Sequence, residues 1–281
     1  MKRMNLIPCI NPDNPFGRLN LIGAGNPHLN PLPLAGEEAI ALSPSGGKLD
    51  RGLARDSHAG RAPTRALCAN GQFGINGLYA ITPDCADTAD LLRRVRLALA
   101  GGACVLQYRN KSADAVLRLA QASALRGLSR EFAVPFIVND DIRLAAQVDA
   151  DGAHLGATDG GVDAARAMLG KHRIIGVSCY NRLSLAQEAV AAGADYVAFG
   201  AFFPSGVKPD AEVANAELLR EARAKLAVPL VAIGGINAQN GASLVQAGAN
   251  ALAVISALFD AADITASAQE FSNLFTQEFA S

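Results

Sequence analysis

The stretch AGADYVAFG, at residues 192–200, ends an Ala-rich amphipathic segment on glycine and passes directly into a short apolar run. The same transition recurs as AGGACV at residues 100–105 and as AGANALAV at residues 247–254. Glycine commonly ends a helix because it adopts the left-handed conformation without a side-chain penalty. The three occurrences of this transition therefore predict a repeated unit in which a helix leads into a strand.

Outward from these transitions, eight short apolar runs alternate with eight Ala/Leu-rich amphipathic segments from residue 77 onward. The expected strands cover residues 78–82, 104–109, 136–139, 152–155, 174–178, 196–200, 230–233 and 251–255. Expected helices include residues 88–100, 113–131, 183–192 and 238–247. Such alternation is typical of a parallel sheet, and eight units in about 205 residues fit a compact (β/α)8, or TIM, barrel. A doubly wound open sheet would alternate too, but no GxGxxG follows the first strand and no GxxxxGK[ST] occurs.

The overall composition excludes several functional classes. The 281 residues include 25 basic and 26 acidic side chains, for a net charge of −1, and 50% are hydrophobic. A general nucleic-acid binder would carry a basic face, so we expect no nucleic-acid partner. No apolar run approaches the ~20 residues that span a bilayer, so we expect no membrane segment. The five cysteines form no CxxC pair and no HExxH occurs, which argues against a zinc site or disulfide framework and favours a cytoplasmic protein.

Residues 1–74 differ in composition from residues 75–281. They hold eight of the thirteen prolines and four Asn-Pro pairs, and their 8 basic and 5 acidic residues leave 17 and 21, a net charge of −4, for the remainder. Proline removes a hydrogen-bond donor and disfavours helix at the residue before it. We therefore expect a low-order, dispensable extension at 1–74 and a catalytic barrel domain at 75–281. A transit peptide and a start site assigned too far upstream are the alternatives for the extension.

Candidate reactive groups are the polar residues at the carboxyl ends of the expected strands, where TIM barrels carry their active sites. Side chains alternate along a strand, so Val105, Gln107 and Arg109 share one face, with Lys111 just beyond it. If Val105 points into the barrel, so do an amide and a guanidinium, which is costly without an anionic partner. Taken alone, the segment also fits a solvated strand end with a stray arginine, and that interpretation is slightly favoured.

Two carboxylates follow neighbouring strands. Asp140 follows the third strand and Asp159 lies in the loop after the fourth, so we expect the two to approach each other. Such a pair suits Mg²⁺, which takes few protein oxygens and keeps other positions for water and phosphate. One carboxylate of the Asp140-Asp141 pair could instead cap the following helix. We expect His154 to be a packing or capping residue rather than a base, because it lies inside a strand.

A phosphate cradle is indicated at the last two strands. Gly234-Gly235 follows the seventh strand and Ser256 follows the eighth, at places that often bind phosphate in such barrels. A tight turn that needs glycine explains the glycine pair about equally well. Lys208 adds a cation after the sixth strand, whereas Cys179, after the fifth, has no histidine at a comparable place to activate it and is expected to pack. The whole set favours phosphate or diphosphate substrates and leaving-group chemistry without a protein nucleophile.

The order of these motifs resembles the thiamine phosphate synthase family. The matching segments are Gln107 to Lys111 (roughly QLREK in the family), Asn139-Asp140, His154-Leu155-Gly156 with Asp159, Gly176-Val177-Ser178, Phe203-Pro204 through Lys208, and residues 232–236 and 254–256. Seven motifs in register at successive strand ends make the resemblance specific. It covers nearly all of residues 77–260 and none of the extension.

The resemblance implies a (β/α)8 enzyme of thiamine biosynthesis. It would join 4-amino-2-methyl-5-hydroxymethylpyrimidine diphosphate to 4-methyl-5-(2-phosphoethyl)thiazole, expected in its carboxylated form, and release thiamine phosphate and pyrophosphate. The implied mechanism is dissociative: pyrophosphate leaves first, and the thiazole nitrogen captures the pyrimidine cation. The implied cofactor is Mg²⁺, with Asp140 and Asp159 as its ligands. The implied pyrimidine diphosphate site comprises Gln107, Arg109, Lys111, Asn139, Ser178 and Lys208. The implied thiazole phosphate site comprises Ser205, Gly206, Val207, Gly235, Ile255 and Ser256.

Two positions depart from the family pattern. Asn110 stands where the family usually has Glu, and we expect little effect. The turn after the sixth strand usually reads close to T-P-T-K, so Val207 lacks a hydroxyl that would bond the thiazole phosphate. The loss of one such bond costs about 1 kcal/mol, or up to ~3 kcal/mol if the phosphate oxygen stays unpaired. We predict that Val207→Thr lowers KM for the thiazole phosphate. An unchanged KM would show that the missing hydroxyl does not weaken binding of this substrate.

Two other functions stay open at this point. A related thiazole tautomerase on the same barrel would need an acid/base histidine and no diphosphate site, and a catalytically idle barrel could retain only the phosphate cradle. Metal dependence separates the three, because only the synthase requires the metal. The expected partners are small phosphate and diphosphate molecules. A second copy of the chain, in a homo-oligomer, is a further candidate partner.

Overall fold

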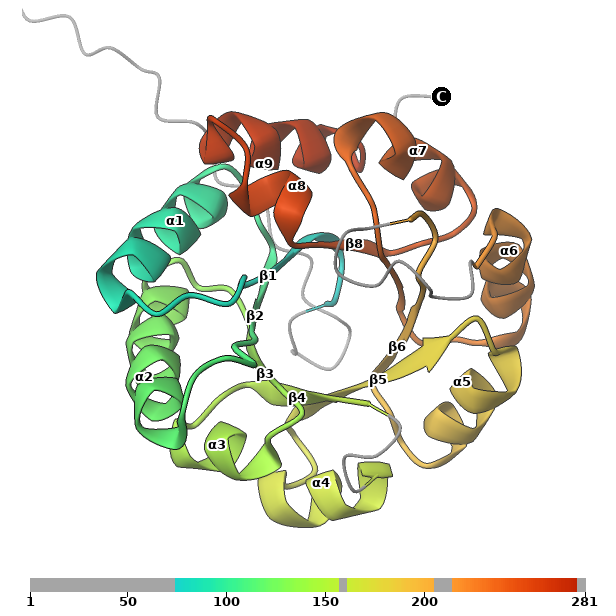
Figure 1. The fold of residues 1–281 in the computed structure, drawn as a ribbon. Helices are drawn as coiled ribbons and strands as arrows, with labels where there is room; N and C mark the ends of the chain where they lie inside the picture. The colour runs from blue at the N-terminus through green and yellow to red at the C-terminus, as the bar shows by residue number, and fades with distance from the viewer. Residues whose placement is uncertain (1–73, 157–160, 205–213, 277–281) are drawn as a thin grey trace, which may run out of the picture. The chain divides into compact units, whose positions relative to one another are not determined.

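The computed structural model describes residues 74–156, 161–204 and 214–276. Within these ranges eight parallel strands pair in sequence order and close into a barrel (Figure 1). The (β/α)8 fold class is therefore confirmed, while the expectation for residues 1–74 falls outside the described residues save for its last position. The strands are β1 (Gly77–Ile81), β2 (Val105–Tyr108), β3 (Phe136–Asn139), β4 (Gly152–Leu155), β5 (Ile174–Tyr180), β6 (Tyr196–Phe199), β7 (Leu230–Ile233) and β8 (Ala251–Val254).

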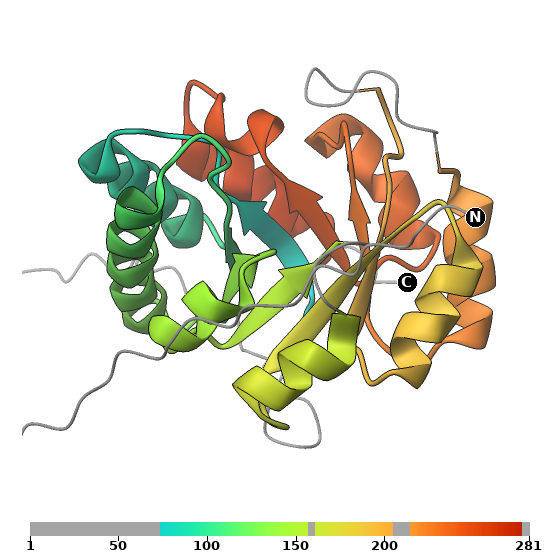
Figure 2. The same ribbon diagram turned by 60° about the horizontal axis from the view of Figure 1, so that its bottom comes forward.

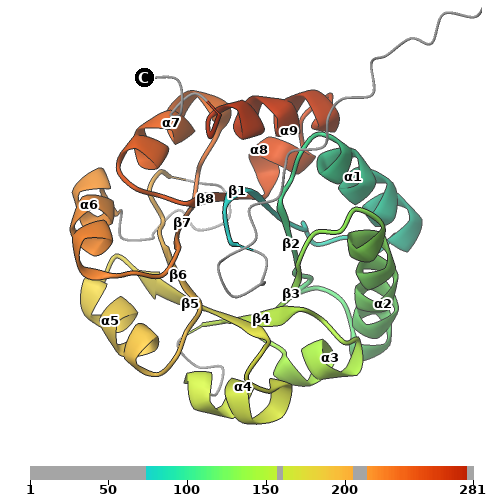
Figure 3. The same cartoon turned by 180° about the vertical axis from the view of Figure 1, so that it is seen from behind.

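Nine helices lie in the described ranges, and they surround the strands in every view (Figures 1, 2 and 3). They are α1 (Thr88–Ala100), α2 (Ala115–Glu131), α3 (Ile142–Gln147), α4 (Gly161–Leu169), α5 (Leu183–Ala191), α6 (Ala216–Lys225), α7 (Ala238–Gln246), α8 (Ser256–Phe259) and α9 (Ile264–Asn273). Eight helices were predicted. The additional one is α8, a single turn after β8 that is too short to show a helical period in the sequence. No described helix has both the length and the apolar character needed to cross a membrane.

Side-chain caps fix where many helices begin. A cap of this kind satisfies a backbone N–H that the first turn leaves without a helical partner. Asp87 accepts the Ala89 N–H at 2.8 Å, and Asn237 forms a reciprocal capping box with Asn240. The described helices that begin at a capping Asp or Asn are α1, α2, α3, α6, α7 and α9. Most of these caps follow a strand closely, so the loops at the strands' carboxyl ends are held in place.

Alternate strand residues fill two apolar layers. Outward-facing residues such as Leu78 and Leu106 pack under the helices. Inward-facing residues form a separate cluster inside the barrel, which includes Tyr79, Val105, Ile137, Ile174, Tyr196, Val231 and Ala251. The register pairs inward residues of neighbouring strands, for example Tyr79 with Val105. The interior is thus a packed core that supports whatever lies at the strand ends.

A glycine in β5 makes room for the largest interior ring. A Cβ atom on Gly176 would lie 1.9 Å from Cζ of Tyr196, and Gly176 pairs with Tyr196 in the register of β5 and β6. Any larger residue would therefore displace this ring. Gly176 belongs to the Gly176-Val177-Ser178 motif, which thus shapes the floor of the barrel opening.

Candidate active site

A cavity of about 890 Å³ opens at the carboxyl ends of the strands. Nine of the fourteen predicted site residues lie in described ranges, and all nine line it: Gln107, Arg109, Lys111, Asn139, Asp140, Ser178, Gly235, Ile255 and Ser256. The other five, Asp159, Ser205, Gly206, Val207 and Lys208, lie outside the described residues. The structure thus gathers residues from β2, β3, β5, β7 and β8 at one opening.

The Arg109 guanidinium and the Lys111 backbone share an acidic neighbour. Val105 is buried in the barrel interior, as the alternation required, and Arg109 lies on the same face. The Arg109 guanidinium donates to Oδ1 of Asp84 at 3.0 Å, and this carboxylate also accepts the backbone N–H of Lys111 at 2.9 Å. Asp84 is the anionic partner that the partly buried guanidinium needs. The sequence reasoning missed it because it follows β1, a strand whose end was not searched for charges.

Asp84 provides a test of how the cations are positioned. Asp84→Ala should raise KM for a diphosphate substrate about fivefold, the equivalent of about 1 kcal/mol for a partly exposed charged pair. The reason is that Arg109 and the Lys111 backbone lose a shared acceptor. Asp90→Ala, which removes an exposed partner of Arg93 on α1, is the matched control and should leave KM unchanged. A lower KM for Asp84→Ala would show instead that Asp84 competes with the substrate for Arg109.

Asn110 organises the loop that carries Lys111. Its side chain is 5% exposed, and its Nδ2 donates to the Cys85 carbonyl at 2.8 Å and to Oε1 of Gln121 at 3.0 Å. Its Oδ1 accepts from Ser112 at 2.9 Å. Oδ1 also accepts a backbone N–H at position 113 at 3.1 Å. The residue that departs from the family pattern therefore acts within the loop and does not line the cavity.

The two carboxylates after β3 have different environments. Asp141 caps α3, with its side chain accepting the Leu144 N–H at 2.9 Å. Asp140 lines the cavity and has a φ of 60°, in the left-handed region that few residues other than glycine adopt. A non-glycine residue in this conformation at a cavity suggests a functional constraint. The capping role that the sequence left open thus belongs to Asp141.

A chain of hydrogen bonds crosses the cavity floor. It runs from Gln107 through Tyr79, Tyr196 and His154 to Ser178, with contacts of 3.0, 2.7, 2.9 and 2.8 Å. Burial raises the pKa of Tyr79 and Tyr196 above the ordinary range, so both phenols are neutral. Sequence reasoning missed the two tyrosines because it searched strand ends only. The register of β1 and β2, which pairs Tyr79 with the inward-facing Val105, places Tyr79 inward, and alternation along a single strand does not reveal it.

His154 differs in part from its expectation. It is buried, at 8% exposed, as a packing residue should be, yet it also lines the cavity. Its ring stacks on Tyr196 with centroids 5.5 Å apart, and both ring nitrogens lie within hydrogen-bond distance of hydroxyls. His154 therefore combines the expected packing with a position on the cavity wall. The register of β4 and β5 brings the ring of an interior strand residue up to the opening.

Strand β5 extends further than predicted. It continues to Tyr180 with a register shift after Ser178. Such an irregularity re-aims the side chains that follow it. As a result Tyr180, Asn181 and Arg182 reach the cavity wall, a set that sequence reasoning did not include.

The Cys179 thiol is packed as expected. It is fully buried, and burial raises its pKa to about 12. Because the thiolate is the reactive form, iodoacetamide at pH 8 should leave Cys179 unmodified in the folded protein and label it in urea. Peptide mass mapping measures both. Equal labelling in the two conditions would contradict the assignment.

Gly234 and Gly235 form a tight contact with the chain that follows β6. Both have positive φ, and a Cβ on Gly235 would lie 2.5 Å from the Phe203 carbonyl oxygen. The Phe203 N–H donates to the Gly234 carbonyl at 3.0 Å. The turn therefore requires glycine, and Gly235 lines the cavity as well. The tight-turn interpretation of the pair is confirmed, and the phosphate cradle stays a prediction.

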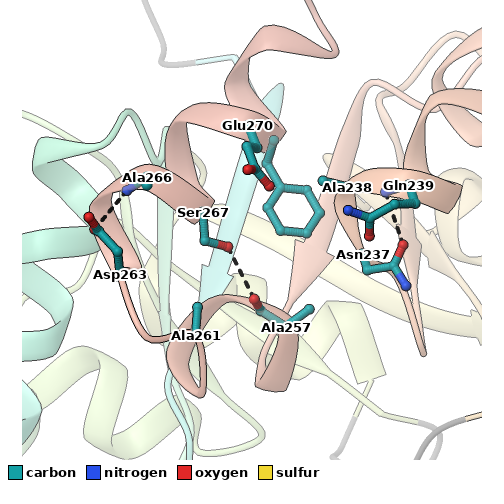
Figure 4. A pocket seen from close by; sticks show the side chains of 10 residues that line it. Asn237, Ala238, Gln239, Ala257, Ala261, Asp263, Ala266, Ser267 and Glu270 are labelled. Atoms are coloured by element: carbon teal, nitrogen blue, oxygen red, sulfur yellow. Dashed lines mark hydrogen bonds between the residues drawn. The ribbon is translucent and has the colours of Figure 1, made fainter.

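A second hollow, of about 340 Å³, lies between the start of α7, α8 and α9 (Figure 4). Two of its polar side chains are engaged locally. Asp263 accepts the Ala266 N–H at 2.9 Å, and the Ser267 hydroxyl donates to the Ala257 carbonyl at 3.1 Å (Figure 4). This hollow does not gather the predicted residues, so the large cavity is the candidate site.

A closed (β/α)8 barrel with cations, a carboxylate and glycine turns around one opening defines a TIM-barrel enzyme. A sequence model of the family described as thiamine monophosphate synthase matches residues 78–258. The chain belongs to this family.

Individual relatives agree with this assignment. Over 201 residues the chain is 56% identical to a thiamine-phosphate synthase of Methylobacillus flagellatus, covering 72% of this chain and 96% of the relative. It is 53% identical to that of Thiobacillus denitrificans over 202 residues, with the same coverage of 72% and 96%. A solved thiamine phosphate pyrophosphorylase from Pyrococcus furiosus is 36% identical, with a TM-score of 0.65, over 72% of this chain and 96% of that structure.

Proposed function

We propose that the chain condenses 4-amino-2-methyl-5-hydroxymethylpyrimidine diphosphate with 4-methyl-5-(2-phosphoethyl)thiazole to thiamine phosphate and pyrophosphate. The observation that carries the proposal is the convergence of nine predicted residues, from five strands, on one cavity of about 890 Å³. Family membership and relatives named thiamine-phosphate synthase support the same reaction. Cys85 and Cys179 are free thiols, which fits a cytoplasmic setting.

In this proposal the β2 and β3 side of the cavity binds the diphosphate. Arg109 and Lys111 supply positive charge, and Gln107, Asn139 and Ser178 supply polar contacts around it. Lys208 adds a third cation. Charged donors of this kind bind phosphate oxygens with short, strong hydrogen bonds. They would stabilise the charge that develops on the leaving diphosphate.

Asp140 fits the proposed Mg²⁺ site. Its carboxylate oxygens are the hard ligands that Mg²⁺ takes. Asp140 and the preceding residue, Asn139, both line the cavity. Asp159 would be the second ligand. When bound, the metal supplies positive charge to the diphosphate. The residues Arg109 and Lys111 would hold the same group from β2.

The thiazole phosphate would lie at the β7 and β8 side. Gly235, Ile255 and Ser256 line that part of the cavity, and Ser205, Gly206 and Val207 complete the proposed set. A glycine at 235 leaves the backbone open to a close approach. The two substrate groups would thus enter the same opening from opposite sides.

The proposed chemistry needs no protein nucleophile. The C–O bond of the pyrimidine methylene breaks and the diphosphate keeps the electron pair. The thiazole nitrogen then donates its lone pair to the pyrimidine cation and forms the C–N bond. Preorganised charges around a leaving group are a major source of catalysis. The buried Cys179 thiol is consistent with this, since its raised pKa keeps it protonated.

One observation favours the thiazole tautomerase as a second candidate function: His154 lines the cavity. Its two nitrogens, however, contact Tyr196 and Ser178 at 2.9 and 2.8 Å, which ties the ring into the cavity floor. Metal dependence separates the candidates. With both substrates, pyrophosphate release in Mg²⁺ and none in EDTA supports the synthase. Thiazole isomerisation that persists in EDTA, without pyrophosphate, would support the tautomerase.

A further inference from the structure

The cavity floor contains five polar groups joined end to end. Gln107 Nε2 contacts the Tyr79 hydroxyl, which contacts the Tyr196 hydroxyl, at 3.0 and 2.7 Å. Tyr196 contacts His154 Nδ1 at 2.9 Å, and His154 Nε2 contacts the Ser178 hydroxyl at 2.8 Å. Each contact needs one proton between its two atoms. Which atom donates in each hydrogen bond can therefore be worked out from Gln107 to Ser178.

The direction starts at Gln107. An amide nitrogen only donates, so the Gln107 Nε2–H donates to the Tyr79 oxygen. Tyr79 is 1% exposed, and burial raises its pKa so that it keeps its proton. If Tyr196 also donated to Tyr79, the Tyr79 proton would have no acceptor among these five side chains. A buried donor without an acceptor is costly. Tyr79 therefore donates to Tyr196.

The same argument carries the direction onward to Ser178. Tyr196 is fully buried and keeps its own proton. Because Tyr196 already accepts from Tyr79, it donates to His154 Nδ1. With Nδ1 as an acceptor, neutral His154 carries its proton on Nε2, and this N–H donates to the Ser178 oxygen. The Ser178 proton is then left to point into the cavity that Ser178 lines.

We propose that Gln107, through the two tyrosines, holds His154 in its Nε2–H tautomer and thereby presents the Ser178 hydroxyl to the cavity as a hydrogen-bond donor. Gln107, Tyr79, Tyr196 and His154 are positioning residues in this account. A serine that only donates matches a ligand atom that only accepts, such as an anionic phosphate oxygen. This last point rests on the proposed function. The tautomer itself does not.

The test is the protonation of the His154 ring in the full chain, measured by ¹⁵N NMR with labelled histidine and without substrate. The wild type should show a protonated Nε2 and an unprotonated Nδ1. An Nδ1–H tautomer in the wild type would overturn the proposal. Because no activity is measured, this result is independent of the reaction that the cavity catalyses.

The Gln107→Leu variant tests the origin of the direction. Without the amide donor both directions of the chain become allowed, so the Nδ1–H fraction should rise about fivefold, the equivalent of one hydrogen bond of about 1 kcal/mol. Gln121→Leu is the matched control, because Gln121 is an equally buried glutamine that also bonds a tyrosine, Tyr108, at 2.9 Å. The control should retain the wild-type tautomer.

A second variant keeps the test decisive if Gln107→Leu does not fold. Tyr196→Phe removes the hydroxyl that donates to His154 Nδ1 at 2.9 Å. This variant should raise the Nδ1–H fraction of His154 to a similar extent. The folded state of each variant is checked by circular dichroism. A wild-type tautomer in every folded variant would show that the chain does not set it.

Discussion

Replacing Asp140 with asparagine should lower the rate of pyrophosphate release about 100-fold or more. The change removes one negative charge from the proposed metal site, and charge stabilisation at a leaving group is worth several kcal/mol. Asparagine tolerates the left-handed backbone that Asp140 adopts at a φ of 60°. The fold should therefore survive, and the loss should appear in kcat and in a higher requirement for Mg²⁺.

The neighbouring residue supplies the control for this prediction. Asp141 caps α3 through its side chain, at 2.9 Å from the Leu144 N–H. Asparagine caps helices about as well as aspartate, so Asp141→Asn should retain nearly full activity. The two variants remove the same charge one residue apart. Equal losses in both would mean that Asp140 has no special role.

Replacing Gly176 with alanine should destabilise the fold and disrupt the cavity floor. The new Cβ would lie 1.9 Å from Cζ of Tyr196, so the ring must move out of its place between Tyr79 and His154. Overpacking of this kind costs about 1–3 kcal/mol. Urea unfolding measures the loss of stability, and thiamine phosphate formation should fall with it.

Gly127 is the matched control for this second prediction. It lies in α2, and a Cβ there would meet no atom within 4 Å. Gly127→Ala should therefore stabilise the protein by about 0.5–1 kcal/mol, because glycine is unfavourable inside a helix. If the urea midpoint of Gly176→Ala equals that of the wild type, the predicted clash between a Cβ at position 176 and the Tyr196 ring is wrong.

Much of the fold was predictable from local signals. Six strands, β3 to β8, and the helices α1, α5 and α7 begin at the residues that the apolar runs and glycine stops indicated. Two features were missed for physical reasons. The helix α8 is a single turn of 4 residues, too short for a helical period to repeat in the sequence. The continuation of β5 to Tyr180 depends on a register shift with β6.

The candidate site was predictable where it follows from strand ends alone. Parallel strands end at one opening, so Arg109, Asp140 and Ser178 could be collected without knowledge of their contacts. Tyr79 and Tyr196 could not be found that way, because aromatic residues inside strands are ordinarily core. Their role emerges only from the hydroxyl contacts across the barrel, such as the 2.7 Å between the two phenols.

The most direct test of the account is the product balance of the full chain. With Mg²⁺ and both substrates, ³¹P NMR should show thiamine phosphate and pyrophosphate formed in equal amounts, and neither should form at a comparable rate when one substrate is omitted. Such a balance would establish that the chain catalyses the condensation. Absence of both products, or pyrophosphate without thiamine phosphate, would contradict the account.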